Sequence, residues 1–246
     1  MIITTEYVDI AVDGSPMRML VAAPREAGRY PGILLYSDIF QLTGSTTRAV
    51  MRLAGHGFVV AAPEIYHRIE AAGTAIPFDD AGRDRGLADA ARTTVAEFDA
   101  DCRAVLDWLR REPRVAPSEL GAAGFCIGGH LAFRAALQPD VRATVCFYPT
   151  GVHNGKLGKD ADAGSLERAA EIGGELLLIF GALDPHVPED GRAKIEAALR
   201  QAGSRFHVSL YPAEHAFMRD EGPRYDAAAT DQAWAEAIAF YRRAFA

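Results

Sequence analysis

The chain has 246 residues, of which 49% are hydrophobic, and its 26 Lys and Arg against 33 Asp and Glu give a formal net charge of −7. This composition is typical of a globular protein with enough apolar side chains for one large core, and it excludes a disordered or fibrous chain. A general nucleic-acid binder needs clustered Lys and Arg against the phosphates. No long basic run is present, so we expect no nucleic-acid partner.

The first sixty residues predict a hairpin followed by buried strands. Alternating residues around an Asp-Gly turn are typical of a β-hairpin, and continuous apolar runs indicate strands that are buried on both faces. The predicted elements are strands over 7–12 and 17–22 around the turn Asp13-Gly14, a strand over 32–36, a helix over 45–56 and a strand over 58–62.

The rest of the chain alternates helices and strands after one irregular segment. Residues 67–85 are polar and irregular and predict a long loop, and apolar residues at helical spacing predict a helix from 89 to 111. A second irregular segment, at 150–174, contains several glycines. The remaining predicted elements are strands over 120–125, 141–148, 176–180 and 207–211 and helices over 128–137, 188–202 and 225–245.

Strands that alternate with helices of these lengths indicate βαβ units and a mostly parallel sheet. Right-handed crossovers then place helices on both faces of the sheet. The opening hairpin is expected to add antiparallel strands at one edge. Because no composition shift marks a boundary, we expect one α/β domain over residues 1–246.

A candidate nucleophile lies in the segment Gly124-Phe125-Cys126-Ile127-Gly128-Gly129, between a predicted strand and a predicted helix. A nucleophile at such a sharp turn has a strained backbone and lies above the sheet, and glycines allow the strand and the helix to approach closely. The turn directs the N–H of Ile127 at a developing oxyanion, and the helix N-terminus favours a thiolate at Cys126. Cys102 and Cys146 lie within a predicted helix and strand and are interpreted as structural.

Chain order selects the partners of Cys126, because triads of this type run nucleophile, acid, histidine. Asp184 closely follows the predicted strand over 176–180, and His215 follows the strand that ends near residue 211. These are carboxyl ends of strands, where parallel sheets bind ligands. His207 begins its strand at the wrong end, and His186 is too close to Asp184 to connect it to the nucleophile. Capping of the following helix is an alternative role for Asp184.

Three segments together resemble the dienelactone hydrolase family, from about residue 30 to the end. They are the cysteine turn over 124–129, Gly181-Ala182-Leu183-Asp184-Pro185-His186-Val187-Pro188, and Glu214-His215-Ala216-Phe217-Met218-Arg219. The resemblance implies an α/β-hydrolase fold and hydrolysis of a small lactone or ester through a Cys-His-Asp triad and an acyl-thioenzyme. The family's substrate bears a carboxylate, so an anionic substrate is expected.

The resemblance also implies further site residues. Arg219 matches one of the family's carboxylate-binding arginines, and Arg85 matches the other, with Arg83 as an alternative. The backbone N–H of Ile39 would be the second oxyanion donor. Asp38 stands where the family typically has a glutamate near the thiol, and because it is one methylene shorter, the lactone specificity follows less directly than the fold.

Two other functions remain open: a thiol-dependent esterase or lactonase of another specificity, and a non-catalytic small-molecule binding protein with a degenerate site. We expect no cofactor and no metal, because no histidine pair has ligand spacing and no Gly-rich loop has dinucleotide or phosphate spacing. The apolar runs are too short to span a membrane, the first residues do not resemble a secretory signal, and three cysteines without framework spacing favour the cytoplasm. A monomer or a homodimer is expected.

Overall fold

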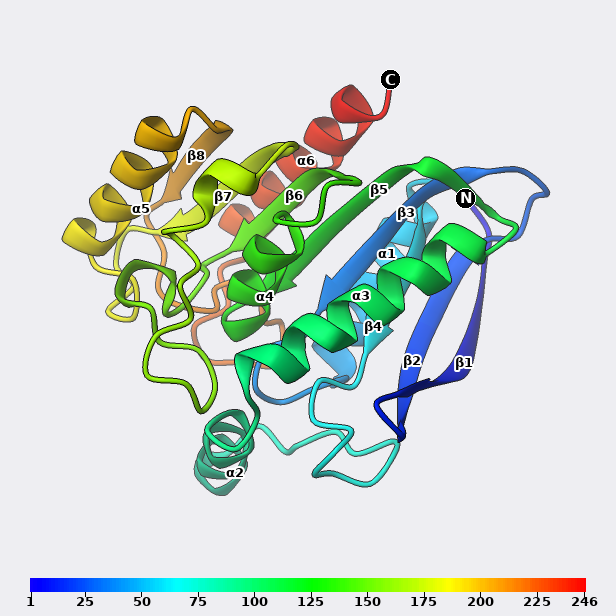
Figure 1. The fold of residues 1–246 in the computed structure, drawn as a ribbon, viewed down its shortest axis with the longest axis horizontal. Helices are drawn as coiled ribbons and strands as arrows, with labels where there is room; N and C mark the ends of the chain where they lie inside the picture. The colour runs from blue at the N-terminus through cyan, green and yellow to red at the C-terminus, as the bar shows by residue number, and fades with distance from the viewer.

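The structure, a computed structural model of residues 1–246, is organised around one eight-stranded sheet (Figure 1). The strand order is β1-β2-β4-β3-β5-β6-β7-β8; β1 pairs with β2 and β2 with β4 in antiparallel fashion, and all other neighbours are parallel. The predicted parallel sheet with an antiparallel N-terminal hairpin is therefore confirmed. The strands are β1 (Ile3–Val12), β2 (Ser15–Pro24), β3 (Tyr30–Tyr36), β4 (Val59–Pro63), β5 (Val115–Phe125), β6 (Val141–Phe147), β7 (Glu175–Gly181) and β8 (Arg205–Tyr211).

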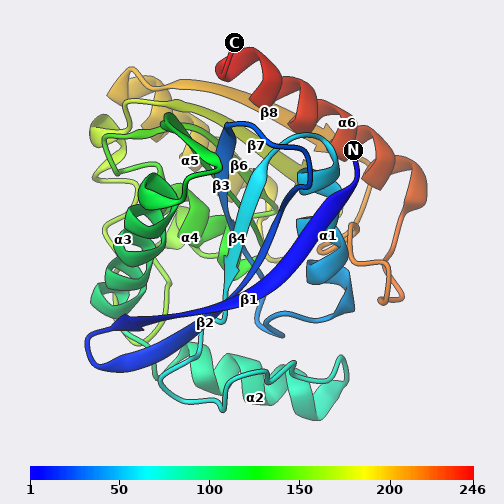
Figure 2. The ribbon, with the colours of Figure 1, turned by 90° about the vertical axis from the view of Figure 1, so that its right-hand side faces the viewer.

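Helices cover both faces of the sheet, as Figure 2 shows with the sheet seen between them. Helices α1 and α6 lie on one face, α3, α4 and α5 lie on the other, and α2 lies below the sheet in both ribbon views. Two 3₁₀ turns, Val152–Asn154 and Ala169–Glu171, lie in the predicted irregular segment. The helices are α1 (Gly44–Gly55), α2 (Asp80–Ala90), α3 (Val95–Arg111), α4 (Ile127–Ala135), α5 (Glu189–Ala202) and α6 (Ala227–Ala244).

The hydrophobic core is divided by the sheet into two clusters. In β3, Leu34 belongs to the cluster under α3 and α4, while its neighbours Ile33 and Leu35 belong to the cluster under α1 and α6. Successive side chains of a strand point to opposite faces. A strand that is covered on both faces therefore needs apolar residues at every position, which explains the continuous apolar runs in the sequence.

The predicted boundary between a loop over 67–85 and a helix over 89–111 is wrong, because the structure has two separate helices there. Helix α2 spans Asp80–Ala90, and α3 does not begin until Val95. Asp79 caps α2 by accepting from the Gly82 N–H at 2.7 Å. The α3 start is fixed by a capping box, in which Thr94 accepts from the Glu97 N–H and Glu97 accepts from the Thr94 N–H. This reciprocal pair satisfies two backbone donors that a continuous helix would have used differently.

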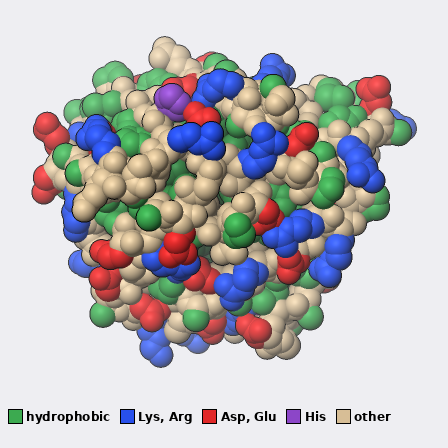
Figure 3. All heavy atoms as spheres, turned by 45° about the horizontal axis from the view of Figure 1, so that its top comes forward, with side chains coloured by type: hydrophobic (Ala, Val, Ile, Leu, Met, Phe, Trp, Pro, Cys, Tyr) green, Lys and Arg blue, Asp and Glu red, His purple; other side chains and the backbone are tan.

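The surface mixes charges of both signs. On the face that Figure 3 shows, Lys and Arg side chains alternate with Asp and Glu side chains. No helix is long and apolar enough to cross a membrane. No group of three or more His, Cys, Asp or Glu side chains is placed to hold a metal ion.

The capping box gives a stability prediction. Thr94→Ala is expected to lower the free energy of unfolding by about 1 kcal/mol, because it removes the side-chain acceptor from the first turn of α3. Arg103→Ala, at an exposed position of the same helix, is the control and should change stability by less than about 0.5 kcal/mol. Urea denaturation measures both, and equal effects of the two substitutions would contradict the role given to the cap.

Candidate active site

The backbone at Cys126 makes the strand-to-helix turn. Strand β5 ends at Phe125 and α4 begins at Ile127, and Cys126 between them has φ 58° and ψ −119°. Positive φ is costly for a residue with a side chain and persists only where its surroundings impose it. A Cβ on Gly124 would lie 1.9 Å from the Gly128 carbonyl oxygen, and a Cβ on Gly128 would lie 2.1 Å from the Ser37 carbonyl oxygen. Glycine at these two positions therefore makes the turn possible.

Asp184 and His215 lie together at the carboxyl ends of β7 and β8. The Nδ1 atom of His215 donates to Oδ2 of Asp184 at 2.7 Å, and both side chains are buried. The second carboxylate oxygen of Asp184 accepts from the His186 N–H at 2.8 Å. Pro188, and not Asp184, occupies the N-cap position of α5, so Asp184 does not have the alternative capping role.

Cys126 and His215 shift each other's pKa. Burial alone would raise the pKa of the Cys126 thiol, but the His215 imidazole and the Thr150 hydroxyl outweigh burial and lower that pKa below its ordinary value. Burial would lower the pKa of His215, but the negative charges of Cys126 and Asp184 raise it to about 9. The two shifts favour a thiolate beside an imidazolium.

Two backbone N–H groups border the same cleft as Cys126. The N–H of Ile127 is directed at Cys126, as expected for the residue after a nucleophile at this kind of turn. Ile39 follows β3, and its N–H has no acceptor within the protein, whereas the next N–H, of Phe40, donates to Asp38 Oδ1 at 2.9 Å. A free N–H at the cleft is available to a substrate oxygen.

The cleft has a volume of about 940 Å³. Cys126 and His215 lie in it, and part of its wall comes from the two segments that the sequence marked as irregular. Helix α2 contributes Arg83 and Leu87, and the 150–174 segment contributes Lys156 and its two successors. A cleft of this size fits a small organic substrate.

Asp38 and Arg219 form a buried ion pair at the cleft. Arg219 is 3% exposed, and its guanidinium lies 4.8 Å from the Phe40 ring centre and 4.6 Å from that of Phe78, a cation–π arrangement. Burial lowers the pKa of Arg219 to about 10, so it stays charged at neutral pH. The Asp38 carboxylate is thus engaged by Arg219 and by the Phe40 N–H.

The two arginines of α2 that the resemblance suggested point in different directions. Arg83 lines the cleft, whereas Arg85 does not. Arg85 instead makes two hydrogen bonds to Glu70, at 2.6 and 2.5 Å. Because residues two apart on a helix do not share a face, only one of them can face the cleft. The structure therefore places Arg83, the alternative, at the cleft and Arg85 outside it, and a substrate-binding role for an arginine of α2 stays a prediction.

Several cleft residues carried no signal in the sequence. The ring of His186 lies edge-to-face on that of His215, with 4.6 Å between centroids. Lys156 and Arg224 line the cleft and form no ion pair. Thr150 Oγ1 lies 3.8 Å from Cys126 Sγ. These residues come from loops whose course the sequence pattern does not fix, and only the sheet that carries the loops brings them together.

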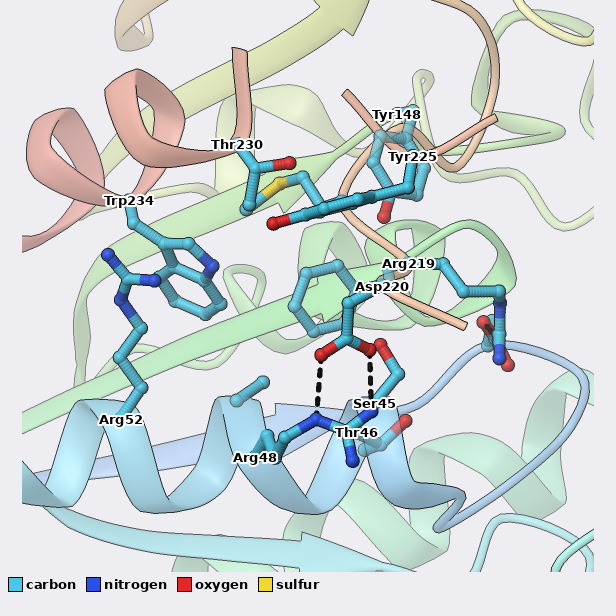
Figure 4. A pocket seen from close by; sticks show the side chains of 14 residues that line it. Ser45, Thr46, Arg48, Arg52, Tyr148, Arg219, Asp220, Tyr225, Thr230 and Trp234 are labelled. Atoms are coloured by element: carbon cyan, nitrogen blue, oxygen red, sulfur yellow. Dashed lines mark hydrogen bonds and ion pairs between the residues drawn. The ribbon is translucent and has the colours of Figure 1, made fainter. Parts of the chain in front are cut away.

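A second pocket, of about 90 Å³, lies beside the cleft and shares Asp38 and Arg219 with it (Figure 4). Arg48 of α1 makes two hydrogen bonds of 2.6 Å to Asp220 in this pocket. Arg52 lies over the Trp234 ring at 5.4 Å. Both arginines are therefore already engaged, and the Asp38–Arg219 pair stands at the boundary between the two spaces.

Known proteins resemble the whole chain. Residues 17–245 match the model of the Dienelactone hydrolase family. A Saccharomyces cerevisiae protein named "Putative carboxymethylenebutenolidase" is 39% identical over 241 residues, which cover 94% of this chain and 88% of that protein. A Synechocystis protein of the same name is 30% identical over 233 residues, 94% of each chain. A Klebsiella pneumoniae structure titled "Putative Dienelactone Hydrolase" has a TM-score of 0.87 at 25% identity, covering 99% of this chain and 100% of its own.

The three cysteines are expected to differ strongly in reactivity. Burial raises the pKa of Cys102 to about 12 and raises that of Cys146 even further, while the pKa of Cys126 is lowered. Because the thiolate is the reacting form, brief treatment of the folded protein with iodoacetamide should modify Cys126 first. Peptide mass mapping identifies the site. Faster labelling of Cys102 or Cys146 would contradict the assignment, and denatured protein, in which all three react, is the control.

Proposed function

Because this chain belongs to the dienelactone hydrolase family and is a carboxymethylenebutenolidase-like hydrolase, we propose that it cleaves a small lactone or ester with Cys126 as nucleophile. His215 is the acid and base, and Asp184 orients it. The observation that carries this proposal is the 2.7 Å bond from His215 Nδ1 to Asp184, made beside a cysteine held at φ 58°. With Nδ1 occupied, Nε2 is the nitrogen left for proton transfer.

Acylation begins with attack of the Cys126 thiolate on the carbonyl carbon. A C–S bond forms, and the π electrons of the carbonyl move to its oxygen, where the N–H groups of Ile39 and Ile127 donate to it. When the tetrahedral intermediate collapses, the C–O bond of the ester breaks and the His215 imidazolium gives its proton to the leaving oxygen. A lactone stays in one piece, as an acyl-thioenzyme that carries the released hydroxyl or enol.

In deacylation His215 acts as a base, whereas it acted as an acid in acylation. Neutral His215 takes a proton from water as the water oxygen attacks the thioester carbon. The C–S bond then breaks, the electron pair returns to sulfur, and the thiolate and imidazolium of the resting site are restored. The carboxylate of Asp184 stabilises the imidazolium formed in this step and stays ionised itself.

Asp38 is proposed to hold Arg219 and not the thiol. Its two oxygens accept from the Phe40 N–H and pair with Arg219, which also fixes the loop that carries Ile39. A substrate carboxylate that enters the cleft would meet Arg219 beside Asp38 and Arg83 at the wall. An anionic substrate is therefore the substrate class that we propose.

A thiol-dependent esterase of another specificity uses the same residues, and hydrolysis of neutral esters with equal efficiency would favour it. A non-catalytic binding protein is disfavoured because the nucleophile, the base and the acid are all competent residue types. That alternative predicts no turnover of any activated ester, whereas turnover that is lost on alkylation of Cys126 would exclude it.

His215→Ala and Asp184→Asn are each expected to lower kcat by at least about a hundredfold, because general acid–base catalysis contributes that much or more. The assay is hydrolysis of an activated aryl ester, with thermal unfolding measured alongside. His207→Ala is the matched control, since His207 is an exposed residue of β8 that pairs with Glu175. Near-normal turnover in either folded variant would remove that residue from the triad.

Substrates with a free carboxylate should have a higher kcat/KM than their methyl esters, by about tenfold or more, because a charge-assisted hydrogen bond contributes about 1.5–3 kcal/mol. Arg83→Gln should reduce this preference. Arg85→Gln is the control, because its ion pair with Glu70 lies outside the cleft. Equal efficiencies for acid and ester in the unmodified protein would refute the anionic substrate, and a loss of preference only in Arg85→Gln would refute the choice of Arg83.

A further inference from the structure

A network of buried, hydrogen-bonded polar groups connects α4 and the 150–174 segment to the cleft. Arg134 is 4% exposed and donates to both oxygens of Asp99, at 2.9 and 2.6 Å. It also donates to the Ala163 carbonyl at 2.7 Å and to Ser165 Oγ at 2.9 Å. His130 lies 2.8 Å from the same Ser165 oxygen. None of these groups takes part in the hydrolytic steps above.

The direction of each hydrogen bond in this network of buried groups can be assigned. His130 is fully buried, and burial together with the Arg134 charge lowers its pKa to about 3, so its ring is neutral. Its Nδ1 lies 3.1 Å from the Thr150 carbonyl oxygen, which can only accept, so Nδ1 carries the proton. Its Nε2 must then accept from the Ser165 hydroxyl, whose oxygen accepts from Arg134. Every member is satisfied, as a buried network requires.

At the cleft, the network of hydrogen bonds ends at Thr150, which makes two contacts with Cys126. The Thr150 N–H donates to the Cys126 carbonyl at 3.2 Å, and the Thr150 Oγ1 atom lies 3.8 Å from Cys126 Sγ. Thr150 also lines the cleft. With its carbonyl held by His130 and its N–H held by Cys126, Thr150 presents its hydroxyl to the sulfur from a fixed backbone.

We infer that Thr150 is a further catalytic residue, whose hydroxyl donates a hydrogen bond to the Cys126 thiolate, and that His130 is a positioning residue that holds Thr150 in place. The inference rests on the proposed function for the identity of the nucleophile. The bond favours the charged sulfur over the thiol or the acylated sulfur. It therefore increases the reactive fraction of the resting enzyme and stabilises the thiolate that leaves during deacylation.

Other groups also face the sulfur. They are His215 from the loop after β8, Tyr148 after β6, Tyr66 after β4 and the Ile127 N–H. Burial raises the pKa of both tyrosines well above the ordinary value, so they stay neutral while the thiol titrates. Of these groups only His215 changes charge in the same pH range, and it is retained in every variant described below.

The test is the pH dependence of Cys126 alkylation by iodoacetamide in the absence of substrate, compared between Thr150→Val and Thr150→Ser. Valine keeps the shape and removes the hydroxyl, whereas serine keeps the hydroxyl. Thr150→Val should raise the midpoint of the profile by about one pH unit, equivalent to a tenfold loss of thiolate below the midpoint. Thr150→Ser should stay near the unmodified protein. An unchanged midpoint in Thr150→Val would overturn the catalytic role.

The positioning role of His130 has its own pair of variants. His130→Asn offers an amide N–H to the Thr150 carbonyl, so its alkylation midpoint should stay close to that of the unmodified protein. His130→Leu should raise the midpoint as Thr150→Val does. If His130→Leu does not fold, Ser165→Ala, which breaks the next bond in the network, replaces it with a smaller expected shift. A folded His130→Leu or Ser165→Ala with an unchanged midpoint would overturn the positioning role.

Hydrolysis measurements separate this inference from the proposed function. Thr150→Val should lower kcat of aryl-ester hydrolysis more than it changes KM, because the bond acts on the sulfur and not on the bound substrate. If the midpoint shifts but no ester or lactone is turned over by any variant, the proposed function fails and the thiolate contact stands. If Cys126-dependent hydrolysis occurs and the midpoint does not shift, only the role of Thr150 fails.

Discussion

The candidate site depends on one backbone constraint, the reversal from β5 into α4 within a single residue. That residue, Cys126, adopts a positive φ that a side chain normally avoids, and close packing of glycines on both sides makes the reversal possible. Strand β5 lies between β3 and β6 in the sheet. The loops that leave those two neighbours therefore flank the sulfur, and they supply Ile39 on one side and Thr150 on the other.

Several buried charges in the protein are paired. Asp184 bonds to His215, Asp38 pairs with Arg219, and Arg134 pairs with Asp99. An isolated buried charge is costly, whereas a paired and hydrogen-bonded one is tolerated. Each pair also connects segments far apart in the sequence: the first two join loops at the carboxyl ends of strands, and the third joins α3 to α4. Of the three pairs, only Asp184–His215 acts on the candidate triad: Asp184, together with Cys126, raises the pKa of His215.

Part of the cleft wall comes from the two segments with an irregular sequence pattern, 67–85 and 150–174. Helix α2 packs against the loop that carries Ile39 so closely that a Cβ on Gly86 would lie 2.4 Å from the Ile39 carbonyl oxygen. The 150–174 segment is held from inside by Ser165 and the Ala163 carbonyl, both bonded to Arg134. Both segments are thus anchored by close packing or by buried hydrogen bonds.

The sequence by itself determined the parallel sheet, the hairpin and the turn at Cys126, because these follow from local periodicity and from glycines at fixed spacing. It also selected Asp184 and His215 as candidates through chain order, and the structure places them 2.7 Å apart. It did not separate α2 from α3, since that boundary depends on caps at Asp79 and Thr94. Only the tertiary structure decided that Arg83 and not Arg85 faces the cleft, and that Thr150 lies beside the sulfur. Those choices depend on which faces of loops and helices meet across the sheet, and contacts between residues far apart in the chain leave no regular pattern in the sequence.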